Sequence, residues 1–152
     1  RLWKISIDHD LNNEVVVTSD SQVIFGGMDK LYVYDANTGT QIRTLRLQYT
    51  NGDQLRQDAL ALGSDNLVYV GGNFGLKCVD RKNGSVSWSS QIGGGWVHGL
   101  TVSKSGRILA RGDDGLYLLS GDSDKGPSHP WPMLYGNEAH TGRAQPASGW
   151  GD

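Results

Sequence analysis

Three consecutive glycines, Gly93 to Gly95, stand directly before Trp96 and His98. Glycines allow the backbone to approach a ligand closely, and an indole beside an imidazole suits stacking and hydrogen bonding to a sugar or another flat molecule. The competing interpretation is that Trp96 packs between two blades of the repeat and His98 hydrogen-bonds a loop carbonyl. Together with charged residues expected on neighbouring loops, the predicted ligand-binding set is Trp96, His98, Arg56, Asp113 and Asp114.

A catalytic alternative starts from the same histidine. Elimination from a uronic-acid polysaccharide needs a base, an acid and a cation that neutralises the sugar carboxylate. His98, Tyr49 and Arg56 are the available candidates. They are suitable residue types on expected loops and form no recognisable motif, so the pattern favours binding over catalysis.

The stretch "DHDLNNE" places oxygen-bearing side chains at alternate positions: Asp8, Asp10, Asn12 and Glu14. Calcium loops use such spacing because a tight turn brings alternate side chains onto one centre. The glycine expected at the sixth place is Asn13, however, and the distal bidentate glutamate is missing. A polar turn is therefore favoured over a calcium site.

Charge and hydropathy exclude two classes of partner. The formal net charge of −2 and a pI near 6.1 provide no basic surface for nucleic acid. No apolar run approaches the roughly 20 residues of a membrane span, and "RLWKISIDHD" lacks a signal-peptide core. Because the chain starts without Met, a processed protein or a piece of a longer one is expected.

The elements that must position these residues repeat along the chain. Gly27, Gly72 and Gly112 are each followed four residues later by a leucine, at spacings of 45 and then 40 residues. Asp35 and Asp80 occupy the same later position of the repeat, 45 residues apart. Glycine is abundant, at 22 of 152 residues. A period of 40 to 45 residues with short β-type runs is typical of β-propeller blades.

The runs of Val, Ile, Leu and Tyr, bounded by Gly, Asn and Asp, predict the individual strands. The expected ranges are 14–19, 22–27, 30–35 and 40–47 in the first unit, 58–63, 66–71, 75–80 and 85–91 in the second, and 99–103, 106–111 and 115–120 in the third.

One segment also resembles a known family. "VYVGGNFGLKCVDRKNGSVSWSSQIGG" is similar to the pyrroloquinoline-quinone-like propeller repeat, with the matching positions Gly72, Leu76 to Asp80, Gly84, Trp88 and Gly93. "PWPMLYGNEAHTGRA" (130–144) resembles a segment that borders such repeats in exported bacterial proteins, which implies a periplasmic or extracellular location. Quinone-dependent members often place adjacent cysteines near the cofactor. This chain has only Cys78 and no matching ligand cluster, so the resemblance does not imply the quinone.

The sequence thus predicts an all-β protein of three four-stranded antiparallel blades plus one extra strand. The expected parts are an outer strand of a preceding blade (1–8), three blades (9–48, 49–93 and 94–135, the last completed by tail residues around 129–135) and an irregular tail (136–152). Closed propellers have typically four to eight blades. A fragment, an open arc or a ring closed by association all remain open, with missing blades, another copy or another protein covering the exposed blade faces.

The function expected from these features is a non-enzymatic binding or scaffolding module, with a carbohydrate as a further candidate ligand. The alternative is a fragment of a polysaccharide lyase or of a quinoprotein dehydrogenase-like enzyme.

Overall fold

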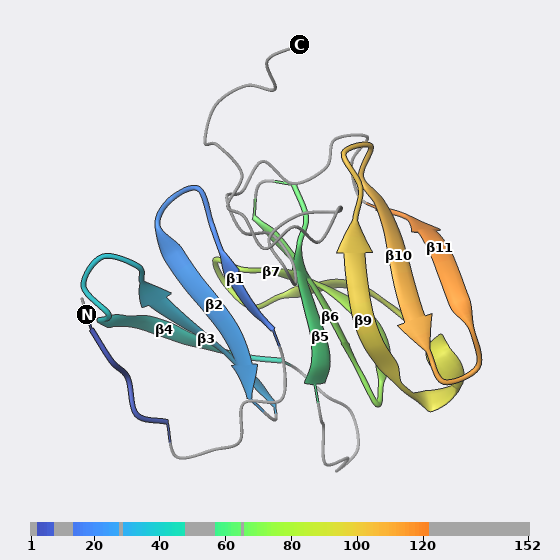
Figure 1. Ribbon diagram of the computed structural model, residues 1–152, viewed down its shortest axis with the longest axis horizontal. Helices are drawn as coiled ribbons and strands as arrows, with labels where there is room; N and C mark the ends of the chain where they lie inside the picture. Colours follow the sequence, from blue (N-terminus) through green and yellow to red (C-terminus); the bar gives the residue numbers. More distant parts are fainter. Residues whose placement is uncertain (1–2, 8–13, 28, 48–56, 65, 122–152) are drawn as a thin grey trace.

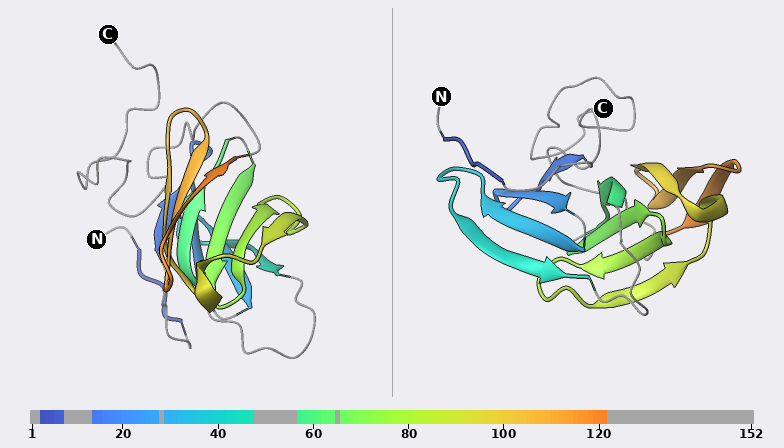
Figure 2. Two further views of the ribbon diagram at one scale, coloured as in Figure 1. Left: turned by 90° about the vertical axis from the view of Figure 1, so that its right-hand side faces the viewer. Right: turned by 90° about the horizontal axis from the view of Figure 1, so that it is seen from below.

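The chain forms three antiparallel β-sheets that lie side by side in an arc (Figures 1 and 2). The computed structural model describes residues 3–7, 14–27, 29–47, 57–64 and 66–121. No helix in this part of the chain is long and apolar enough to cross a membrane. The predicted all-β architecture of propeller blades is confirmed.

Each sheet is a blade whose strands follow chain order. Blade 1 consists of β1 (Val15–Val17), β2 (Gln22–Gly27), β3 (Lys30–Asp35) and β4 (Gln41–Arg46). Blade 2 consists of β5 (Gln57–Leu62), β6 (Leu67–Gly72), β7 (Gly75–Asp80) and β8 (Val86–Ser90). Blade 3 contains β9 (Val97–Val102), β10 (Arg107–Gly112) and β11 (Leu116–Ser120), after a short 3-10 turn, η1 (Gly93–Gly95). The tail strand expected around 129–135 lies outside the described residues.

The repeated aspartate organises the hairpin turn between the third and fourth strands. Asp35 and Asp80 each accept a backbone hydrogen bond from the glycine four residues later, Gly39 and Gly84, whose φ angles are 72° and 79°. The Asp35 carboxylate also accepts the amides of Asn37 and Thr38. Glycine is required because side chains rarely adopt a positive φ, so this part of the repeat is architectural.

Two apolar layers hold the blades together. One lies between blades 1 and 2 and includes Ile24, Leu31, Val33, Leu60 and Val68, all fully buried. The other lies between blades 2 and 3 and is built from Ala59, Ala61, Tyr69, Leu76, Cys78, Val97, Leu100, Val102, Ile108 and Ala110. Blade 2 therefore contributes to both layers, with alternate residues of its strands on its two faces.

A polar contact reinforces the first of these layers. Arg81, only 5% exposed, donates from Nη1 to the Asp20 carboxylate at 3.0 Å and to the Gln22 side-chain oxygen at 3.2 Å. Arg43 donates to the same Gln22 oxygen at 3.0 Å. The guanidinium of Arg81 thus links the β7–β8 turn of blade 2 to the β1–β2 turn of blade 1.

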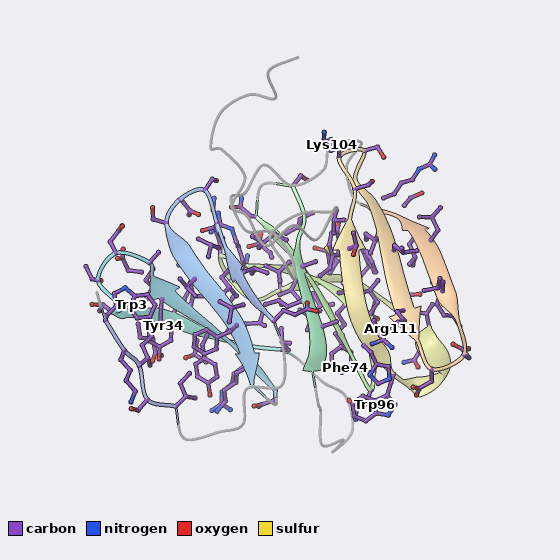
Figure 3. The ribbon with its side chains drawn as sticks, in the orientation of Figure 1. Trp3, Tyr34, Phe74, Trp96, Lys104 and Arg111 are labelled. Atoms are coloured by element: carbon purple, nitrogen blue, oxygen red, sulfur yellow. The ribbon has the colours of Figure 1, made fainter. Side chains whose placement is uncertain are left out.

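The first residues differ from the strand expected there. Residues 3–7 form no strand ladder, although half-buried Trp3, Ile5 and Ile7 alternate with exposed Lys4 and Ser6. The Trp3 indole donates to the Ala36 carbonyl at 2.9 Å and packs against Gly39 (Figure 3). A side-chain contact with the β3–β4 turn thus anchors the segment where main-chain pairing was expected.

Candidate functional site

The candidate site lies at one edge of blade 3, where the β8–β9 connection meets the β10–β11 turn. Gly94 and Gly95 have φ angles of 64° and 117°. A Cβ atom on Gly94 would come within 3.0 Å of the Asp114 side chain, so the absence of a side chain lets the two loops approach each other. Figure 3 shows Trp96 at this edge and Lys104 at the opposite end of the blade.

His98 is directed to this edge by a β-bulge. Gly99 pairs with Arg111 while Val97 pairs with Gly112, so His98 is the extra residue on β9. Blade 2 has the same irregularity, because Ala59 pairs with Gly71 and Gln57 with Gly72. Bulges change the direction of a side chain without ending the strand, which explains why His98 leaves the alternating pattern of the core.

The structure brings three of the predicted ligand-binding residues together. The rings of Trp96 and His98 are parallel to within 3°, with centroids 5.9 Å apart, and His98 Nε2 lies 2.7 Å from Asp113 Oδ1. Because a carboxylate only accepts, Nε2 carries the proton in this contact. The His98 and Asp113 side chains are 29% and 50% exposed, so both remain accessible to a ligand.

Asp114, the fourth predicted residue in this region, is held by a partner that the sequence did not point to. The Tyr117 hydroxyl donates to Asp114 Oδ2 at 2.6 Å. Tyr117 lies on β11 and its ring packs against the layer between blades 2 and 3. The sequence offered one signal for this contact. Asp114 and Tyr117 are three residues apart across a tight turn, and such a turn brings the first residues of β11 close to Asp114.

A second aromatic residue lies at the same edge of the molecule. Phe74, in the β6–β7 turn, has the Lys77 ammonium 5.5 Å from its ring centroid (Figure 3). Burial lowers the pKa of Lys77 from its ordinary value. Phe74 and Trp96 therefore give this edge two aromatic rings on adjacent blades.

The other predicted residues are not assembled into this site. Tyr49 and Arg56 lie outside the described residues, as do Asp8, Asp10 and Asn12 of the calcium candidate set. Glu14 is described, and its carboxyl group accepts the Leu60 amide at 2.9 Å while burial raises its pKa to about 7. Within the described ranges, no three His, Cys, Asp or Glu side chains are grouped as a metal site.

Comparisons with known proteins support the fold. No family model matches the sequence, and no curated protein matches it. Among solved structures, the WD40 β-propeller domain of Doa1 superposes with a TM-score of 0.56 at 16% identity, over 69% of this chain and 34% of that one. The chain thus spans about a third of that propeller. The computationally designed Ika4 protein gives a TM-score of 0.44 at 18% identity, over 76% of this chain and 94% of the other.

The blade topology and the Doa1 match together define the chain as a β-propeller module. At 16% identity the likeness concerns the fold alone.

Proposed function

We propose that this chain is a non-enzymatic binding module of the pyrroloquinoline-quinone-like propeller type, acting in the periplasm or outside the cell. The repeat residues Gly72, Leu76 to Asp80, Gly84 and Trp88 support the family, and the 130–144 segment supports the location. The observation that carries the binding role is the cluster of Trp96, His98 and Asp113 at the edge of blade 3.

The chemistry of this cluster favours a carbohydrate as the ligand. An indole offers an apolar face to the C–H groups of a sugar ring, while carboxylates and imidazoles bond its hydroxyls. Asp113 retains a second carboxylate oxygen beyond the one that contacts His98, and its side chain is half exposed. Such a site would hold one or two sugar units at the surface of the module.

Isothermal titration calorimetry with a panel of neutral and uronate oligosaccharides tests this proposal. We expect at least one oligosaccharide to bind saturably, and Trp96→Ala to weaken that binding about fivefold or more, since loss of a stacked aromatic removes roughly 1 kcal/mol or more. Lys104→Ala, at the far end of blade 3, is the control and should bind unchanged. Absence of binding across the panel, or equal binding by Trp96→Ala, would contradict the proposal.

One observation favours a second candidate, an enzyme acting on uronate polysaccharides. A carboxylate that orients a histidine is the arrangement used in many general bases, and Asp113 contacts His98 in this way. Under the binding proposal, we expect no unsaturated uronate product, followed by its ultraviolet absorbance, from any polymer tested. If the unmodified chain releases this product and the His98→Ala variant does not, the chain is an enzyme and the non-enzymatic proposal is wrong.

A further inference from the structure

The β7–β8 turn of blade 2 contains an Asn-Gly pair, in which Asn83 is exposed and Gly84 is buried. In such a pair the backbone nitrogen that follows the asparagine can attack the side-chain amide carbon, because glycine has no Cβ atom to obstruct the approach. The other described asparagines, Asn37, Asn66 and Asn73, precede residues with larger side chains. Among the described residues, the conditions for spontaneous deamidation are therefore met best at Asn83.

The reaction needs only water besides the chain itself. The Gly84 nitrogen loses its proton and bonds to Asn83 Cγ, the bond from Cγ to Nδ2 breaks, and the amide nitrogen leaves with that proton as ammonia. Water then opens the cyclic imide. Opening at Cγ gives aspartate, whereas opening at the main-chain carbonyl gives isoaspartate, in which the backbone runs through the side-chain methylene group.

The folded turn opposes the first step of this reaction. The Gly84 amide donates to the Asp80 carbonyl at 2.8 Å, and Asn83 Oδ1 accepts the Ser85 amide at 2.8 Å. A buried, hydrogen-bonded amide loses its proton only when the structure around it opens, as in hydrogen exchange. Attack by the Gly84 nitrogen therefore requires the turn to open.

The equivalent turn of blade 1 is held by more hydrogen bonds. There the Asp35 carboxylate accepts the amide of Asn37 and both the amide and the hydroxyl of Thr38. In blade 2 the Asp80 carboxylate accepts the Lys82 amide at 2.7 Å, and no other described group donates to it. Because fewer bonds must break, the β7–β8 turn should open locally while the blades stay folded.

The same turn also joins blade 2 to blade 1. Arg81 donates to Asp20 and Gln22 of blade 1, and a Cβ atom on Gly84 would lie 3.4 Å from Leu45 Cβ of the same blade. Isoaspartate at position 83 adds one carbon atom to the backbone between these two contacts. Both contacts cannot then keep their present geometry.

We propose that Asn83 is a site of spontaneous deamidation, that local opening of the β7–β8 turn sets its rate, and that the isoaspartyl product loosens the contact between blades 1 and 2. This proposal does not depend on the sugar-binding role of the Trp96 cluster.

Peptide mapping by mass spectrometry, on the chain kept at pH 8 and 37 °C, measures the conversion of each asparagine. We expect Asn83 to react at least tenfold more slowly in the folded chain than in urea-unfolded chain, but at least tenfold faster than Asn66 or Asn73 in the folded chain. Below the urea concentration that unfolds the protein, the rate should stay nearly constant, because local opening exposes little surface. Equal rates in folded and unfolded chain, no product at Asn83 in the folded chain, or a rate that follows the unfolded fraction would overturn the proposal.

Asn83→Thr is the matched variant, because Thr38 has the equivalent place in blade 1 and its hydroxyl accepts the Thr40 amide at 3.2 Å. After storage, the isoaspartyl fraction of the unmodified chain should melt a few degrees below fresh protein. The stored variant should keep its melting temperature, although Asn51, which also precedes a glycine and lies outside the described residues, is still present. An isoaspartyl fraction that melts like fresh protein, or an equal loss in the variant, would overturn the link to blade packing.

Discussion

Replacing Gly71 with arginine is expected to separate blades 2 and 3 and to cost more than about 4 kcal/mol of folding free energy. Even a Cβ atom at this position would lie 2.6 Å from Val97 Cγ1 and 2.9 Å from Val97 Cβ. Overpacking alone costs about 1–3 kcal/mol, and an unpaired guanidinium in the layer that contains Ala59 and Leu76 adds a desolvation penalty of several more. For a chain of this size, the melting temperature should fall by roughly 10 °C or more.

The reverse exchange in blade 3 is the matched control. Arg111→Gly removes an exposed side chain from the equivalent strand position, and its cost should stay near 1 kcal/mol, the ordinary penalty of glycine in a strand. Gly99→Ala serves as a second control, because among the described residues an added Cβ would meet only Arg111 atoms, at 3.7 and 4.0 Å. Differential scanning calorimetry of the three variants gives the comparison. Similar losses for Gly71→Arg and Arg111→Gly would show that the blades do not pack as described.

The fold could be predicted from the sequence because its signals are local and repeated. Alternation of apolar residues defines each strand within one or two residues at most boundaries, as for β3 and β7, where expected and observed ranges coincide at 30–35 and 75–80. Gly39 and Gly84 mark turns because their positive φ angles exclude most side chains. Each of these features depends on residues within one hairpin, so no long-range information was needed.

The contacts of the candidate site were less accessible because they depend on tertiary geometry. Glycines before Trp96 and the turn at Asp113 pointed to this region, but the bond between His98 and Asp113 joins residues 15 positions apart through a bulge. The Glu14 contact with Leu60 spans 46 positions and two blades. Strand pattern alone gives neither the bulge nor the packing angle between blades. The start of the chain shows the same limit, because the indole of Trp3 hydrogen-bonds the β3–β4 turn where the sequence pattern predicted a paired strand.

Glu14 is expected to make the stability of the chain fall as the pH rises from about 4.5 to 7. Burial raises the pKa of this carboxyl group from 4.5 to about 7, and the hydrogen bond from the Leu60 amide only partly opposes that shift. At low pH the group is protonated in both the folded and the unfolded chain and contributes no pH dependence. As the pH passes 4.5 the unfolded chain releases the proton while the folded chain still holds it, so ionisation favours unfolding.

The loss is complete above pH 7, where the buried group is ionised too. A shift of this size corresponds to a destabilisation of roughly 3 kcal/mol at pH 8 relative to pH 4. Glu14→Gln keeps an oxygen that can accept the Leu60 amide and removes the ionisation. The variant should therefore be more stable than the unmodified chain at pH 8, and its advantage should shrink steadily as the pH is lowered toward 4.5.

Chemical denaturation of both proteins at pH 4.5, 6, 7 and 8 measures the difference, because ionisations shared by the two chains cancel. Asp29→Asn is the control: it also replaces a carboxylate by an amide, in the β2–β3 turn, and so measures the general effect of removing one negative charge from the chain. A Glu14→Gln variant that is less stable at pH 8 than the unmodified chain would mean that the ionised carboxylate strengthens the contact with Leu60. That result would favour a stabilising charge at Glu14, as a bound cation requires, and would support the calcium interpretation of the 8–14 segment.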